Sequence, residues 1–549
     1  MNRLPLLLIF LTIAFPAPAA LGQTAGDRVV VIREAKVKSG DVVVAAFPVG
    51  QALEVFAVRG DSIFVSDVST GWISKTDVTD PERAIANFSD WVRRQPNSAE
   101  AHLARGNARA ARDQFDAAID DYNASLRLNP RSTLALQRRG LAWAKKGELT
   151  KALADLDAAL RIDPEASRAW YYRATVHELA GTRKQALSDL AKALRLNRGY
   201  ALAYRYRGAT LLKTGDAENA LLDLNEALRL NPHDATALAS RGAAWLMTGE
   251  NAKAIDDATE AIRSQHKLAP AWATRGAAWL AMGKYEKAVA DSTEATRLDP
   301  KFDAAFANRG QAHLLAGRAD LALADFDEAA RLDPRNPDVL VHRGYARARL
   351  GELEPAFDDL ATAIELDPRN ARAFACRGEL NEQAGRLDKA LADYDEAIEI
   401  APDNAAVWQR RSLVWSKTGR HDRALADLDE ALRINADDAR ALARRATVLA
   451  ACPTAKFRNG DLAFTDARHA CQLTEWKQAD SLGALAAACA ELGDFEKAVE
   501  WQTLAGKFVA SDQRVAEYQS RLDLYRQGKP FRERVERPTI TSASSGEKK

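Results

Sequence analysis

The sequence predicts a mainly α-helical solenoid preceded by a small antiparallel β-barrel. Two observations carry this prediction. Between residues 27 and 78, short β-branched runs alternate with glycines, a pattern typical of short strands joined by tight turns. Beyond that segment, prolines recur in a thirty-four-residue register, and this period corresponds to one helical hairpin that must stack on its neighbours to bury its apolar face. The prolines in this register are Pro96, Pro130, Pro164, Pro232, Pro300, Pro334, Pro368 and Pro402.

The composition of the chain argues against several classes of function. Its 549 residues include 77 Lys and Arg against 76 Asp and Glu, a formal net charge of +1. A chain without a positive field has no general means of attracting phosphate backbones, so we expect no nucleic-acid binding. The four cysteines are too sparse for a scaffold held by disulfides, and we expect free, mostly buried thiols.

The first residues have the pattern of a secretory signal. Arg3 precedes an apolar run over residues 4–15, and Ala17-Pro18-Ala19 offers small residues for cleavage. We therefore predict a signal peptide over residues 1–23. The apolar run is too short to span a membrane, and no later stretch is long enough. The mature protein is expected to be exported, to the periplasm or the exterior, without a membrane span.

Residues 27–78 are predicted to form the barrel. The β-branched runs are separated by Gly40, Gly50, Gly60 and Gly71. The stretch over residues 71–78 resembles the last strands of bacterial Src-homology-3-like domains. That resemblance implies a module that binds peptides or wall material, or that only packs against its neighbour.

A helix over residues 80–96 is expected to join the barrel to the solenoid. Ten repeats follow over residues 99–438, and we number the positions of each repeat from Ala99. Position 8 is small in all ten repeats and position 20 is always alanine, so we expect the two helices of a hairpin to cross closely there. Glycines between the helices suit the left-handed residue that ends a helix. They are Gly147, Gly181, Gly215, Gly249, Gly283, Gly317, Gly351, Gly385 and Gly419.

This pattern resembles the tetratricopeptide repeat family. Its marks include Trp170 at position 4, Gly208 at position 8, Ala220 and Ala227 at positions 20 and 27, and Pro232 at position 32. The resemblance implies a right-handed α-α superhelix of antiparallel helix pairs with a concave groove. Three repeats lack the closing proline, but their length is unchanged, so we expect the same turn.

Ten regular repeats end at residue 438, and the register breaks after Ala446. Residues 439–511 are predicted to form two divergent repeats, the first with an insertion, and residues 512–527 a capping helix. The tail over residues 528–549 is rich in Pro, Ser and charge, and we expect it to be disordered. The combined barrel and repeats also resemble exported proteins of planctomycete-type bacteria.

Arginine at position 7 and aspartate at position 23 recur in all ten repeats. In the central repeats these residues are Arg241, Arg275, Arg309, Asp223, Asp257 and Asp291. We predict a structural ladder of ion pairs in which each aspartate contacts the arginine of the following repeat. The alternative is a row of anion-binding arginines in the groove, but carboxylates at the same period would neutralise it.

No pattern of residues points to catalysis. The eight histidines form neither an i, i+4 pair nor a zinc-type spacing with cysteine, and no phosphate-binding glycine loop or nucleophile elbow occurs. We expect no catalytic residue, no cofactor and no metal, and we classify the chain as non-enzymatic.

The predicted function is protein-protein interaction through the groove. In the related family the groove is lined by the first helix of each hairpin, and here aromatic and cationic residues cluster in the early repeats. They suit an extended acidic or carboxyl-terminal peptide, although the tyrosines could instead pack between hairpins. One alternative is contact with the cell envelope or wall polysaccharide through the barrel, and another is a regulatory subunit of a separate enzyme. The candidate peptide-binding residues are Gln137, Arg168, Tyr171, Tyr172, Arg205, Tyr206 and Lys213.

Overall fold

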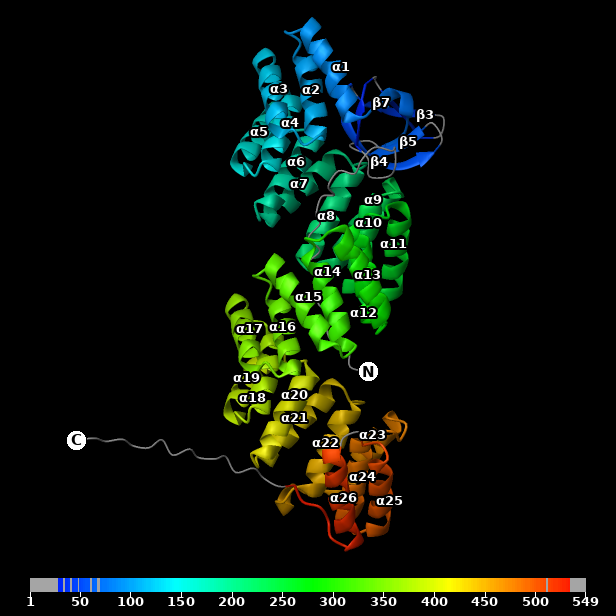
Figure 1. Cartoon of the computed structure of the whole chain (residues 1–549), viewed down its shortest axis with the longest axis vertical. Coiled ribbons are helices and arrows are strands. Elements are labelled where there is room, and N and C mark those ends of the chain that lie inside the picture. Colours follow the sequence, from blue (N-terminus) through cyan, green and yellow to red (C-terminus); the bar gives the residue numbers. More distant parts are fainter. Residues whose placement is uncertain are drawn as a thin grey trace, which may run out of the picture. The chain divides into compact units, whose positions relative to one another are not determined.

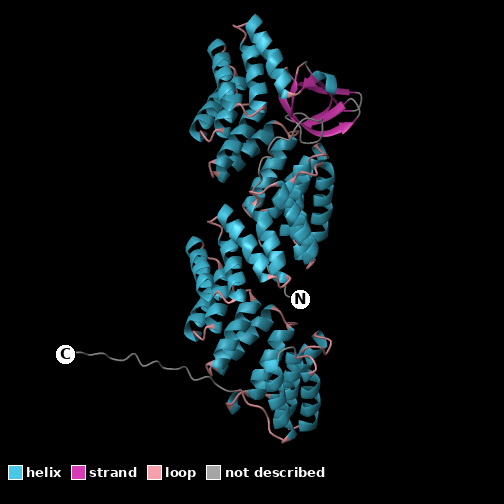
Figure 2. Ribbon diagram, in the orientation of Figure 1, coloured by secondary structure: helices cyan, strands magenta, loops and turns pink. Residues whose placement is uncertain are grey.

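The computed structural model describes residues 28–32, 35–39, 42–47, 49–59, 62–66, 70–509 and 512–533. The predicted signal peptide, residues 1–23, and the part of the predicted tail over residues 534–549 lie outside these ranges. The chain divides into two units, Met1–Pro334 and Arg335–Lys549, and each is described by itself. Helices dominate both units, and the strands gather in one small sheet (Figure 2).

The N-terminal segment forms a seven-stranded antiparallel sheet in the order β3-β2-β6-β5-β4-β1-β7. Buried side chains from all seven strands meet in one cluster, so the sheet must curl around it. Within the described residues the edge strands β3 and β7 do not pair, so the sheet is open and the expected closed barrel is not formed. The strands are β1 Arg28–Val31, β2 Ala35–Ser39, β3 Val42–Phe47, β4 Ala52–Arg59, β5 Ser62–Ser66, β6 Thr70–Ser74 and β7 Val78–Thr79.

The sheet packs on the first helices of the solenoid. α1 (Pro81–Arg94) begins at Asp80, whose side chain accepts a hydrogen bond from Arg83 N, and it packs with β1 and α2. Gly50 lies so close to Ala104 of α2 that a Cβ atom on Gly50 would approach Ala104 Cβ to 2.7 Å. Arg28 of β1 pairs with Asp113 at 3.2 Å, just after α2. The sheet therefore covers part of the first helix of repeat one.

Ten helical hairpins follow, each with a first and a second helix (Figure 1). In the first unit they are α2 Ala99–Ala111, α3 Phe115–Leu128, α4 Thr133–Lys145, α5 Leu149–Ile162, α6 Ser167–Leu179, α7 Arg183–Leu196, α8 Ala201–Lys213, α9 Ala217–Leu230, α10 Ala235–Met247, α11 Asn251–Ser264, α12 Ala269–Ala281, α13 Tyr285–Leu298, α14 Asp303–Leu315 and α15 Ala319–Leu332. In the second unit they are α16 Pro337–Leu350, α17 Leu353–Leu366, α18 Ala371–Gln383, α19 Leu387–Ile400, α20 Ala405–Lys417 and α21 His421–Ile434.

The turn after each second helix has the same length with or without proline. α7, α11 and α21 end at Leu196, Ser264 and Ile434, and the next helix begins five residues later, as it does in the repeats that carry proline. The prediction for the three repeats without proline is confirmed. The proline is therefore compatible with this turn but is not what creates it.

The predicted glycine turns are also confirmed, because all nine glycines between the helices have positive φ. In the first repeat Asp113 takes the same place with φ 58°.

Gly249→Ala is expected to lower the free energy of unfolding of the first unit by about 1 kcal/mol, because an L side chain is strained in the left-handed region. No atom lies within 4 Å of a Cβ atom at Gly249, whose φ is 81°, so the cost is one of backbone conformation alone. Chemical unfolding followed by circular dichroism measures it. Gly249→Asn should cost less, since asparagine tolerates this region, and equal losses would contradict this explanation.

The two helices of each hairpin cross at positions 8 and 20, as predicted. A Cβ atom on Gly140 would lie 3.1 Å from the carbonyl oxygen of Ala152, and one on Gly344 would lie 3.2 Å from that of Ala356. A side chain larger than that of alanine or serine at position 8 would thus meet backbone that cannot move aside.

The first helices line the inner side of each unit. Within the described residues, successive first helices pack on one another, as α10 does on α12 and α12 on α14, whereas successive second helices make no comparable contact. A stack that is tighter on one side curves toward that side, so the first helices form its concave surface.

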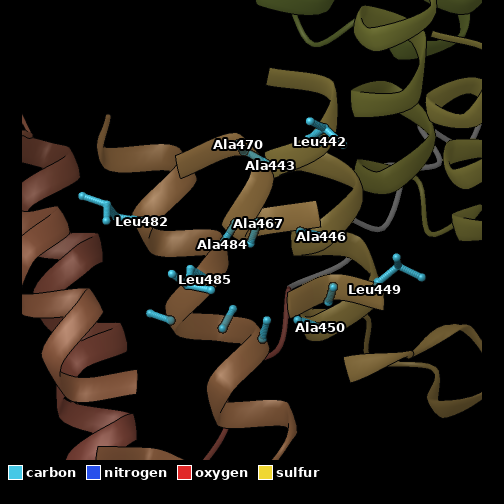
Figure 3. Packing of buried hydrophobic residues seen from close by; sticks show 14 of the residues in the cluster. Leu442, Ala443, Ala446, Leu449, Ala450, Ala467, Ala470, Leu482, Ala484 and Leu485 are labelled. Atoms are coloured by element: carbon cyan, nitrogen blue, oxygen red, sulfur yellow. The ribbon is translucent and has the colours of Figure 1, made fainter. Parts of the chain in front are cut away.

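The second unit ends in two divergent hairpins and a last helix. They are α22 Ala439–Ala451, α23 Gly460–Leu473, α24 Ala479–Glu491, α25 Phe495–Gly506 and α26 Asp512–Arg526. Alanines and leucines of α22, α23 and α24 interlock in the core of this end (Figure 3).

The first residues of the predicted disordered tail are ordered. Phe531 packs against the core of the last hairpins, and Glu533 N donates to Ala451 O at 2.9 Å. The expectation of disorder from Gly528 is therefore wrong for residues 528–533. Composition favoured disorder, but one aromatic side chain and unpaired helix carbonyls were enough to anchor this segment.

Candidate functional site

The arginine at position 7 pairs with the aspartate of its own repeat. Arg241 Nε and Nη2 each donate to Asp257 at 2.7 Å, and Arg275 donates to Asp291 at 2.7 and 2.9 Å. Arg309 and Asp325 make the same bidentate contact. The aspartates are buried, and the hydrogen bond to Asp189 raises the pKa of the equivalent Arg173.

The prediction that each aspartate contacts the following repeat is wrong. Asp223 pairs with Arg207 of its own hairpin, not with Arg241. The junction is instead spanned by Nη1 of the arginine, which reaches position 25 of the preceding repeat, as Arg241 does to Asn225 at 2.9 Å and Arg173 to Asp157 at 2.7 Å. A guanidinium has donors on two edges, so one group can close its own hairpin and also hold the previous one.

The same guanidinium also stacks on the aromatic residue at position 4. Arg173 lies 4.6 Å from the ring centroid of Trp170, and Arg275 lies 4.9 Å from that of Trp272. The indole N–H of Trp272 in turn donates to His266 O in the turn before the helix. The arginines of this row thus have their donors and faces committed within the protein, which supports a structural role over anion binding.

A second cation-π row was missed at the sequence level. Lys151, Lys253 and Lys287 at position 19 lie 4.4 to 4.6 Å from the tryptophan rings at position 11. These tryptophans are Trp143, Trp245 and Trp279. The spacing of eight residues between Trp and Lys was a readable signal, and it joins the two helices of one hairpin.

The structure brings the predicted tyrosines together on α6 and α8. The Tyr171 ring centroid lies 5.6 Å from that of Tyr172, 5.1 Å from that of Tyr200 and 5.8 Å from that of Tyr206. Tyr171, Tyr172 and Tyr200 are buried, and Tyr206 is half-buried. Burial raises the pKa of Tyr206, so its phenol stays neutral. Most of this aromatic surface therefore packs between hairpins three and four.

The predicted cations surround this cluster but have internal partners. Arg205 pairs with the buried Asp234 at 3.0 Å, and Lys213 pairs with Glu178 at 2.8 Å. The Lys213 side chain is 24% exposed and that of Glu178 only 7%. Arg168 is half-buried at the start of α6, and Gln137 is buried on α4. Arg168, Arg205, Tyr206 and Lys213 are the predicted residues that are half-buried, on α6 and α8.

A second polar cluster lies on the first helices of the second unit. His342 Nε2 lies 3.2 Å from Arg372 Nη1, and burial together with that guanidinium lowers the pKa of His342 to about 3. Burial raises the pKa of the Cys376 thiol to about 12 and raises that of Glu379. A thiol held in its protonated form is a poor nucleophile at neutral pH.

His342 is expected to make the second unit less stable in acid. Its pKa is lower in the folded state than in the unfolded state, so the unfolded chain binds the extra proton as the pH falls from about 6.5 to about 3. His342→Gln should reduce the loss of stability between pH 7 and pH 5 by about 2 kcal/mol. Thermal unfolding at both pH values measures it, with the exposed His469→Gln as control, and an unchanged pH slope would contradict it.

Within the described part of the chain, no group of three or more His, Cys, Asp or Glu side chains is placed to hold a metal ion. The four cysteines are free, and Cys452, Cys471 and Cys489 are buried. No helix among the described residues has both the length and the apolar content required to cross a bilayer.

Comparison with known families agrees with this architecture. One tetratricopeptide repeat profile matches residues 77–133, 103–167, 138–201, 207–270 and 275–337, and a second matches residues 371–404. Together the matches cover just over half of the chain. The chain belongs to the tetratricopeptide repeat family. The first match begins before α1, so the profile includes that helix in its first hairpin.

Three solved structures are similar to this chain at low identity. The crystal structure of the APC/C hetero-tetramer Cut9-Hcn1 has a TM-score of 0.46 at 14% identity, over 74% of this chain and 93% of that one. Yeast Tom70 has a TM-score of 0.39 at 19% identity, over 78% and 96% of the two chains. A tetratricopeptide repeat protein from Parabacteroides merdae has a TM-score of 0.38 at 18% identity, over 45% and 98%. No curated protein matches the sequence.

Proposed function

We propose that this tetratricopeptide repeat chain is a non-enzymatic scaffold that binds peptide segments of other proteins on the inner surface of its first helices. The observation that carries the proposal is that half-buried Tyr206 lies against the tyrosine cluster of α6 and α8, with Glu178, the partner of Lys213, nearby and with half-buried Arg168 on α6. An aromatic edge next to cations suits an extended peptide that carries carboxylates.

The charges of this surface favour an acidic or carboxyl-terminal segment. An ammonium group has three donors, and the bond from Lys213 to Glu178 uses one of them. The ring of Tyr206 offers apolar area at small entropic cost, since few of its bonds rotate. The buried Tyr171 packs against the ring of Tyr206 and so holds that ring in position.

The test uses the full chain and a library of acidic peptides, some with a free carboxyl terminus. The variant Arg168→Gln with Lys213→Gln should bind the selected peptides at least about tenfold more weakly, which corresponds to about 1.4 kcal/mol. The control Arg161→Gln with Arg195→Gln changes two exposed arginines on second helices and should bind like the parent. If Arg168→Gln with Lys213→Gln bound the selected peptides as tightly as the parent does, the proposal would be contradicted.

The wall-binding alternative has less support. Trp72, the aromatic residue on which a sugar would stack, lies edge-on to Phe64 at 5.2 Å and 6.3 Å from the ring of His233 in the fourth repeat. Neighbouring rings thus already contact it. Sedimentation with isolated wall material would revive this alternative if the chain pelleted with it.

We also propose that the protein works outside the cytoplasm and that its N-terminal sheet is related to bacterial Src-homology-3-like domains. The basic and apolar start of the sequence supports export. Sequencing the amino terminus of the protein recovered from an envelope fraction tests it, since an uncleaved start would count against a signal peptide.

A further inference from the structure

The first helix of repeat eleven ends differently from the regular first helices. In repeat five, Gly249 N donates to Leu246 O at 3.1 Å and Glu250 N to Trp245 O at 2.8 Å, so the turn itself satisfies the last carbonyls. α22 instead ends at Cys452, immediately before Pro453. Proline has no amide hydrogen and forces the residue before it into an extended conformation. The carbonyls at the end of α22 therefore need donors from elsewhere.

Asn459 N donates to Leu449 O at 2.9 Å and Arg458 Nη1 to Cys452 O at 3.0 Å, and the C-terminal segment supplies donors for the two carbonyls between them. Arg532 Nη1 donates to Ala450 O at 2.9 Å, and Glu533 N donates to Ala451 O at 2.9 Å. Arg532 Nη2 also pairs at 2.5 Å with Glu491, the last residue of α24, whose other carboxylate oxygen accepts from Arg458 Nε at 2.8 Å. One guanidinium thus links the ends of two neighbouring first helices.

Phe531 anchors the segment by its ring. It packs against the core to which α21 to α26 contribute, and the guanidinium of Arg521 lies 4.2 Å from its centroid. Tyr525 beside it is buried, and this burial raises the pKa of its phenol to about 12. Phe531 is thus a half-buried ring that packs on the core and lies beside a cation, and it holds the segment in place.

The segment approaches the inner surface of the unit. Arg444 occupies position 6 of α22, and its electrostatic neighbours are Glu533, Asp480, Glu382 and Arg410, the last at position 6 of the repeat before. Burial lowers the pKa of Arg444, and the negative charge of Glu533 acts in the opposite direction because it stabilises the charged guanidinium. In Figure 1 the chain that follows α26 turns back toward α22.

We propose that the inner end of repeats eleven and twelve is a peptide-binding subsite that the chain fills with its own Phe531, Arg532 and Glu533. The subsite takes an aromatic residue followed by arginine and an acidic residue, bound through the carbonyls of Ala450 and Ala451 at the end of α22 and through Glu491. A partner with that chemistry must first displace the tail, so the tail acts as a tethered competitor. This inference concerns the second unit and does not depend on the acidic-peptide site proposed for the first.

The test compares the full chain with one truncated after Gly528. The probe is a fluorescent peptide of residues 528–536. It should bind the truncated chain at least about tenfold more tightly than the full chain, because the tethered tail competes at an effective concentration of about millimolar. A peptide with Phe531→Ala and Arg532→Ala should bind the truncated chain at least about tenfold more weakly than the parent peptide. Equal affinity for both chains, or no binding to either, would overturn the proposal.

A second measurement covers the case in which truncation unfolds the last repeats. Hydrogen exchange of the Glu533 amide in the full chain should be slowed at least about tenfold relative to the free peptide. Phe531→Ala with Arg532→Ala should abolish this protection while the amides of α24 stay protected, and the exposed Arg526→Ala should leave it unchanged. Exchange at the rate of the free peptide in the parent would contradict the proposal. The variant Arg168→Gln with Lys213→Gln should behave like the parent here, which separates this result from failure of the proposed function.

Discussion

Arg275→Met is expected to lower the free energy of unfolding of the first unit by about 3 kcal/mol, because it leaves a buried carboxylate without its partner. Asp291 receives two hydrogen bonds from Arg275, and the two side chains are only 10% and 19% exposed. The substitution also removes the contact with Trp272 and the bond to Thr259 of the preceding repeat. Guanidinium unfolding followed by circular dichroism measures the loss, and hydrogen exchange should locate it in repeats five to seven.

Arg263→Met is the matched control. Arg263 pairs with Glu260 on the surface of α11, where the side chains are 73% and 52% exposed, so its loss should cost less than about 1 kcal/mol. The double variant Arg275→Met with Asp291→Leu should recover part of the stability, since no buried charge is left unpaired. Equal effects of the two single changes would show that the row of arginines does not stabilise the solenoid.

Gly140→Val is expected to cost about 3 kcal/mol by forcing apart the two helices of repeat two. A Cβ atom there would lie 3.1 Å both from the Ala152 carbonyl oxygen and from Leu156 Cγ. The carbonyl belongs to helix backbone and cannot rotate away, so the crossing itself must widen. The same unfolding experiment measures the effect.

Gly140→Ala provides the comparison. Ala174 and Ser412 occupy the same position in repeats three and ten and are fully buried, so the crossing can accept one carbon atom. Alanine also gains about 1 kcal/mol of helix propensity over glycine, which offsets the tighter contact. Gly140→Ala should therefore be nearly neutral, and a loss as large as that of Gly140→Val would contradict steric crowding as the cause.

The repeat architecture could be predicted from the sequence because it depends on residues whose effects are local. A glycine such as Gly249 fixes a left-handed turn, and a small residue such as Gly140 fixes a crossing, whatever the rest of the chain does. Ten copies in one register then removed any ambiguity of period. The curled sheet was predicted as strands, but whether its edges join depends on pairing between distant segments.

The partners of long side chains could not be predicted in the same way. Arg241 could reach either of two repeats, and the choice depends on which edge of the guanidinium faces each neighbour. The burial of Tyr171 and Tyr172 likewise depends on how closely neighbouring hairpins stack. At the C-terminal end, Phe531 is the sole aromatic residue after Tyr525, and that isolated ring was the signal for an anchored segment.

The link from position 7 arginines such as Arg241 to position 25 of the hairpin before has a consequence for how such a chain can evolve. Ala191 and Ala361 at position 25 offer no side-chain acceptor to the following Arg207 and Arg377, yet the next helix begins five residues after the preceding one ends, as in the other repeats. The junction between two successive repeats therefore does not require a particular residue at position 25. Duplication or loss of thirty-four codons at any point between Ala99 and Pro334 would recreate the same join, so the number of repeats can change without loss of the fold. A gain of one codon within a helix would instead shift every following residue out of the repeat register.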